Sequence, residues 1–363
     1  MEEFQLSLGQ SGMLTSFFAI TGLLLAFPAG IIIQRLGPKF AGLIALGSLV
    51  AGSTMGIFST SINILLFSRV IEGIGMGLIA VVGPAVIAMW FPRKNQGIPM
   101  GIWSTWASMG ALLMYNLAPM IANTGGWQAV WWFGSIFALV GFILLAFFMK
   151  VPAKSMNPVA EQNSDSTNGS ISTQSGMKET LMNVNLWLLA FQFACYVCVL
   201  SAFATFLPTF LNAELDFDLA DAAFIASIPT FVILGAAPFS GWLSDKIGSR
   251  KKIYTIAFAC LAVILIFPFH LSPEQFPYFM PLMGIVAAGV PTAVFASVPE
   301  VTKNPKMIGI AVAMLITGQN LGLFIGPIYF GLVIDATSWL TAGYTLVPIC
   351  LLGTLAGWFV KVR

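Results

Sequence analysis

Charged residues are scarce in this sequence. Only 8% of its 363 residues are charged, whereas a soluble domain has about a quarter of its residues charged. These charges are too few to cover a surface that faces water, and 58% of the residues are hydrophobic. We therefore expect an all-α membrane protein with the lipid bilayer as its solvent. The net charge of +2, without a basic patch, argues against nucleic acid as a partner.

Histidine and cysteine are scarce too. The single histidine, His270, argues against His-rich metal sites and Ser-His-Asp triads. Cys195 and Cys198 form a C-x-x-C in the middle of an apolar run, whereas reactive thiols lie at helix N-termini, so we expect two small buried side chains. The sequence also lacks a phosphate-binding G-x-x-x-x-G-K-[ST] loop. We therefore expect neither an enzyme nor a bound cofactor or metal.

Eleven segments are long and apolar enough to cross a bilayer, because a helical span needs about 20 mostly apolar residues. We expect helices, since the strands of a membrane barrel would alternate apolar and polar residues. The eleven segments are 11–34, 38–59, 62–91, 98–122, 128–150, 184–211, 220–243, 252–271, 276–298, 307–334 and 339–360.

The basic residues predict how these spans are oriented. Of the 16 lysines and arginines, all but Arg69 fall in alternate loops or at the C-terminus, and the opposite loops hold acidic residues instead. The positive-inside rule makes the first set cytoplasmic, so we expect a multi-pass protein of the inner cell membrane with a cytoplasmic C-terminus. The polar segment 151–183 is expected to be a flexible cytoplasmic linker between a bundle of five spans, 1–150, and a bundle of six, 184–363.

A short loop occurs twice, at an offset of 211 residues. The first copy carries Gly30, Gln34, Arg35 and Gly37, and the second carries Gly241, Asp245, Lys246, Gly248 and Arg250. Both copies join two predicted spans on the cytoplasmic side, where the later glycine of each copy suits a tight turn. Parallel repeats of this kind are typical of one transporter architecture.

At these residues the chain resembles the major facilitator superfamily of secondary transporters. The hallmark loop of that family, G-x-L-x-D-R/K-x-G-R-R/K, is matched at 241–251, whereas the first copy departs from it at Gln34. Two more motifs are similar to the family's, R-x-x-x-G-x-G at 69–75 and G-x-x-x-G-P at 322–327. The motifs are nearest those of bacterial cyanate, nitrate and organic-anion permeases.

The resemblance implies two six-helix bundles that rock around a central site, in a monomer that moves a small molecule with protons. Family order makes the first span here the family's second helix, so the first family helix is missing. We expect a start codon upstream of Met1; the alternative is a natural truncation. The resemblance also implies that Asp245 approaches the N-terminus of the span that begins near Ile98 and stabilises a closed cytoplasmic side. The alternative is that the loop charges only set topology.

Arg69 lies about 10 Å inside the span that begins at Ile62, at 1.5 Å per residue. A charge at that depth faces a cavity or a partner. Three alternatives stand: Arg69 binds an anionic substrate or moves with a coupling proton, it extends toward the membrane surface, or it pairs with Glu72. Protonation of Glu72 would free Arg69, which makes Glu72 a candidate for proton coupling.

Further polar side chains inside spans are candidates for the substrate path, and the alternative for each is helix packing. They are Trp103, Asn116, Gln192, Tyr196, Gln319 and Asn320. Glycines such as Gly322 and Gly326 are expected to let helices approach closely. Since Arg69 is the cation inside the spans, we expect a proton-coupled transporter of a small anion. The alternatives are an anion exchanger and a membrane sensor that transports nothing.

Overall fold

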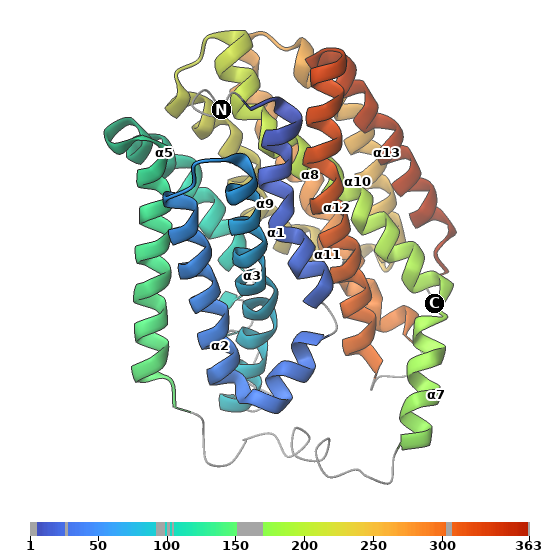
Figure 1. Ribbon diagram of the computed structural model, residues 1–363. Coiled ribbons are helices and arrows are strands. Elements are labelled where there is room, and N and C mark those ends of the chain that lie inside the picture. Colours follow the sequence, from blue (N-terminus) through green and yellow to red (C-terminus); the bar gives the residue numbers. More distant parts are fainter. Residues whose placement is uncertain are drawn as a thin grey trace. The chain divides into compact units, whose positions relative to one another are not determined.

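The computed structural model describes residues 6–25, 28–91, 99, 102–103, 105–150, 170–302 and 307–361, and all regular structure there is helical. Its α-helices are α1 (Leu8–Leu25), α2 (Pro28–Ile57), α3 (Ile62–Trp90), α5 (Trp106–Phe148), α7 (Ser170–Leu181), α8 (Val184–Leu215), α9 (Leu219–Ile247), α10 (Arg250–Ile264), α11 (Phe276–Val301), α12 (Ile308–Ala336) and α13 (Trp339–Phe359) (Figure 1). Two short 3-10 helices, η3 (Pro268–His270) and η4 (Pro273–Gln275), precede α11. In the described part of the chain, 10 helices are long and apolar enough to cross a membrane. The predicted all-α membrane protein is confirmed.

Helix α5 covers two of the predicted spans. Its 43 residues would extend about 60 Å, twice the thickness of a bilayer's hydrocarbon core. The backbone leaves helical geometry at Gly125 and Gly126, between predicted spans 98–122 and 128–150. The described residues of the first predicted span, 11–34, are helical, in α1 up to Leu25 and in α2 from Pro28.

Both copies of the repeated loop turn at a glycine. Gly37 has φ 78° and Gly248 has φ 67°, in the left-handed region that side chains with a Cβ disfavour. A Cβ at either position would meet nothing within 4 Å, so the backbone angle and not the available space requires glycine there. The prediction of tight turns at these two glycines is confirmed.

The chain forms two compact units. Unit 1 comprises Met1–Ser16, Gly110–Met120 and Gly176–Arg363, and unit 2 comprises Phe17–Met109 and Ile121–Ser175. The division into bundles 1–150 and 184–363 stays a prediction. The segment predicted as a flexible linker contains α7 over its last third.

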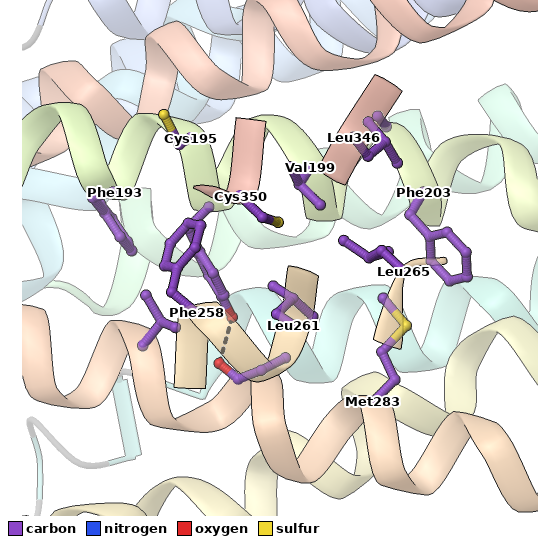
Figure 2. Packing of buried hydrophobic residues seen from close by; sticks show 14 of the residues in the cluster. Phe193, Cys195, Val199, Phe203, Phe258, Leu261, Leu265, Met283, Leu346 and Cys350 are labelled. Atoms are coloured by element: carbon purple, nitrogen blue, oxygen red, sulfur yellow. Dashed lines mark hydrogen bonds between the residues drawn. The ribbon is translucent and has the colours of Figure 1, made fainter. Parts of the chain in front are cut away.

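The core of unit 1 surrounds α8, which is buried along most of its length. Figure 2 shows part of this core, where Val199 and Phe203 of α8 lie near Leu261 of α10, Met283 of α11 and Cys350 of α13. The C-x-x-C cysteines of α8 are free thiols and both are buried, as expected for small apolar side chains.

Helices α8 and α12 approach each other along a row of glycines. A Cβ at Gly318, Gly322 or Gly326 would collide with a backbone carbonyl of α8, at Ala190, Ala194 and Cys198 in turn. Glycine every fourth residue keeps one face of α12 free of side chains, so the two backbones touch. The predicted role of Gly322 and Gly326 is confirmed. We call this row of contacts the α8–α12 seam.

Candidate functional site

Arg69 and Glu72 form an ion pair on α3. The Nη1 of Arg69 donates to the Oε2 of Glu72 at 2.7 Å, as positions three apart on one helix face allow. Glu72 is only 9% exposed, so its charge is removed from the surrounding solvent. Such a buried carboxylate requires partners for both of its oxygens.

The second oxygen of Glu72 is bound by α2. The hydroxyl of Ser53 donates to Oε1 at 2.6 Å. The two helices come this close because Gly52 lacks a side chain; a Cβ there would lie 2.8 Å from the Ser68 carbonyl of α3. Glu72 is therefore held by one charged and one neutral donor, from two helices.

The guanidinium of Arg69 also packs against α5. Its Cζ lies 4.1 Å from the centroid of the Trp131 ring, within the range of a cation–π interaction. The side chain is 33% exposed, and its Nε is buried without a hydrogen-bond partner. We call Arg69, Glu72, Ser53 and Trp131 the Arg69 cluster; its cation carries a buried N–H donor, at Nε, that has no hydrogen-bond partner.

The direction of Arg69 bears on one of the alternatives. Glu72 lies one helical turn further from the start of α3 than Arg69 does, so the guanidinium turns away from the Ile62 end. A side chain that extended toward the nearer membrane surface would turn the other way. The cluster is electrically neutral while Glu72 is ionised, and a proton on Glu72 would give it a net positive charge.

Two of the predicted path residues lie inside the core of unit 1. Tyr196 is 6% exposed and its hydroxyl donates to the Ala287 carbonyl at 2.9 Å. Gln192 is fully buried beside Gly357, and neither its amide nitrogen nor its oxygen has a hydrogen-bond partner. Both positions fit the packing alternative at least as well as a place on a substrate path.

The other predicted path residues are more accessible. Asn116 is exposed and donates to the Leu112 carbonyl at 2.8 Å. Trp103 is half-buried and stacks on Trp106, with ring centroids 5.7 Å apart. Gln319 and Asn320 are half-buried on α12.

The repeated loops are described in part. The backbones of Gly30, Gln34 and Asp245 are helical. The side chains of Gln34 and Asp245 and the whole of Ile98 lie outside the described part of the chain, so the contact of Asp245 stays a prediction. Gly241 is half-buried in α9 and Arg35 is exposed. Lys246 lies over the Trp242 ring, and the Nε of Arg250 pairs with Glu300 at 2.9 Å, which joins α10 to α11.

Ser53 and Trp131 were not predicted from the sequence. A tryptophan close to the end of a span is typical of a membrane-interface anchor, which gives no hint that its ring packs against an arginine. Ser53 stands in the small-residue run 51–54, whose pattern indicates a close helix contact but not its partner.

Comparison with known proteins places the chain in a family. The family model for the Major Facilitator Superfamily matches residues 1–283. The chain belongs to this superfamily. It is 25% identical to the "Probable sulfoacetate transporter SauU" of Cupriavidus necator over 98% of this chain and 84% of that protein. It is 26% identical to the "Nitrite extrusion protein" of Bacillus subtilis over 94% of this chain and 82% of that one.

Solved structures show the same fold. A crystal structure of a D-xylose–proton symporter superposes with a TM-score of 0.72 at 18% identity, over 98% of this chain and 88% of that one. The superfamily member described here is thus a multi-pass membrane protein with the fold of secondary transporters.

Proposed function

We propose that this chain is a secondary transporter that carries a small anion, coupled to protons, by alternating access. The observation that carries the proposal is the Arg69 cluster, a cation and a carboxylate inside one membrane-spanning helix. The two relatives above are named for sulfoacetate and nitrite, which are both anions. The proposal includes eleven spans, a monomer, the inner membrane and a cytoplasmic C-terminus, in agreement with the distribution of lysine and arginine.

The charge balance of the cluster supports coupling to protons. While Glu72 is ionised it neutralises Arg69, and an anion would compete with a carboxylate only 2.7 Å away. A proton on Glu72 removes that competitor and leaves Arg69 with an uncompensated charge. Binding of the anion and binding of the proton then favour each other by the same free energy, because linkage is reciprocal. The unused Nε–H of Arg69 offers the anion a donor in addition to the group that Glu72 releases.

A purely structural ion pair is the second candidate role. Ser53, Trp131 and the Arg69–Glu72 pair all lie in unit 2, on α2, α5 and α3, which is the pattern of a contact that holds three helices together. Under this alternative the cluster stabilises unit 2 and the substrate binds elsewhere.

Uptake into proteoliposomes tests the proposal, with labelled nitrite and sulfoacetate and with and without an imposed pH gradient. Arg69→Ala should lower uptake about tenfold to a hundredfold, which corresponds to the free energy of one lost hydrogen bond to a charged group. Glu72→Gln should retain exchange of internal for external anion. Its uptake should no longer depend on the pH gradient, because the glutamine side chain cannot take up or release a proton. Lys178→Ala, at an exposed lysine of α7, is the matched control.

The outcomes separate the alternatives. Gradient-dependent uptake in Arg69→Ala at the wild-type rate would leave only the structural role for the pair. Exchange without any response to pH in the wild-type protein would indicate an anion exchanger. A folded protein that takes up neither anion would favour the sensor alternative.

A further inference from the structure

The N-terminus of α1 is bound by a carboxylate that is 327 residues away in the sequence. The N–H groups of Leu8 and Gly9 donate to the two carboxylate oxygens of Asp335, at 3.0 and 2.8 Å. The N–H of Gln10 donates to the Ser7 hydroxyl at 3.2 Å. The first turn of a helix has no partners of its own for these groups and carries partial positive charge. Asp335 therefore supplies two of three partners and a complementary charge.

Small residues bring the two backbones together beneath this carboxylate. Pro327, Gly331 and Asp335 recur every fourth residue on one face of α12. A Cβ at Gly331 would collide with the Leu8 carbonyl, and a Cβ at Gly12 would collide with the Pro327 carbonyl. All these residues belong to unit 1. We call this set of contacts the α1–α12 contact.

The repeat provides a comparison for α1. Helix α9 begins at Leu219, at the same 211-residue offset from Leu8 that separates the two repeated loops. Its first turn is capped locally, because the Asp218 carboxylate accepts from the Ala220 N–H at 3.1 Å. A local cap moves with its helix. The two hydrogen bonds from α1 to Asp335 break whenever α1 and α12 separate.

We propose that Asp335 is a positioning residue of the transport cycle, which stabilises the closed state of the predicted outer side and releases α1 when that side opens. The inference rests on the proposed alternating access, since α1 belongs to the first predicted bundle and α12 to the second. Release is tolerable because Asp335 is exposed, so water replaces its lost partners. A second hydrogen bond also joins the first predicted bundle to the second. The Tyr115 hydroxyl of α5 donates to the Ala204 carbonyl of α8 at 3.0 Å, within unit 1.

A cysteine at Ser16 reports whether the α1–α12 contact opens. Ser16 is fully buried, and Gly9, Gly12 and Ser16 follow one another at spacings of three and four residues, on the same face of α1. We would label Ser16→Cys with a maleimide in purified full-length protein carrying Cys260→Ser, because Cys260 is the exposed native thiol. The buried Cys195, Cys198 and Cys350 stay in place, and their labelling reports unfolding.

Asp335→Ala should raise the labelling rate of Ser16→Cys about twofold to fivefold, the effect of one charge at a helix terminus. Asp335→Asn should raise it less, because asparagine keeps one acceptor and loses the charge. Asp218→Ala, the matched control on α9, should leave it unchanged. If the core cysteines of Asp335→Ala are labelled, that variant has unfolded, and the labelling rate in Asp335→Asn then tests the proposal. An unchanged rate in Asp335→Asn and Asp335→Ala, or an equal rise in Asp218→Ala, overturns the proposal.

This readout needs no substrate, so it is independent of the anion. A response of Ser16→Cys in a protein that takes up no anion would refute the proposed substrate and leave the role of Asp335 intact. Proton-dependent anion uptake together with an unresponsive Ser16→Cys would refute the role of Asp335 alone.

Discussion

The α8–α12 seam and the Arg69 cluster join helices in opposite ways. In the seam, three glycines leave one face of α12 without side chains. The backbone of α12 therefore contacts the carbonyls of α8, and no charged side chain takes part. In the cluster, a hydroxyl, a carboxylate, a guanidinium and an indole join α2, α3 and α5. Lipid removes most of the hydrophobic drive between helices, so close packing and polar contacts are the two sources of stability that remain.

The difference indicates where a proton can act. Contacts in the seam depend on size alone, so protonation leaves them unchanged. Contacts in the cluster depend on the charge of Glu72, which a proton removes. We therefore expect the seam to be sensitive to added volume and the cluster to be sensitive to charge.

The largest effect is expected for Gly322→Ala in the seam. Its new methyl group would collide with the Ala194 carbonyl, and overpacking of this kind costs about 1–3 kcal/mol of folding free energy. The measurement is the midpoint of thermal unfolding in detergent. Gly235→Ala in α9 is the control, because a Cβ there meets nothing within 4 Å and should be neutral or slightly stabilising. Equal losses in the two variants would show that the seam is not tightly packed.

A smaller effect is expected for Ser53→Ala in the cluster. It removes a hydrogen bond to a charged group, at a cost of about 1.5 kcal/mol, the low end for such a bond, because Glu72 keeps its ion pair with Arg69. Ser135→Ala is the control, since the Ser135 hydroxyl bonds the neutral Thr54 hydroxyl between α2 and α5 at 2.9 Å. In a Glu72→Gln background the two alanine variants should cost the same, because the charge is gone. A difference that persists there would contradict the role of charge.

The smallest effect is expected for Trp131→Phe. Phenylalanine keeps an aromatic face with a weaker attraction for the guanidinium, at a cost of about 0.5–1 kcal/mol. Trp132→Phe is the neighbouring control, because Trp132 is 46% exposed and contacts Phe58 instead of a cation. A loss confined to Trp131, and absent when Arg69 is alanine, would assign the effect to the cation–π contact.

Much of the fold was predictable from local composition. Hydropathy located the spans, and the repeated loops located two turns whose glycines have positive φ. The same reasoning did not predict α7, because hydropathy does not distinguish a polar helix from a polar linker. Hydropathy measures the environment of a segment and carries little information about the conformation of its backbone.

The site was predictable in part for a related reason. Arg69 and Glu72 are three residues apart, so their pairing follows from the geometry of one helix. Ser53 and Trp131 come from other helices, and no pattern in the sequence identifies them as partners of Arg69 and Glu72.

By itself the sequence determined the solvent of this protein, its helical class and its family, because each depends on composition or on short motifs within one segment. Only the tertiary structure decided that Glu72 is shared with Ser53, that Trp131 covers Arg69 and that Asp335 caps α1. Those contacts join residues that are 19, 62 and 327 positions apart in the sequence. They form only where helix packing brings the two backbones within reach.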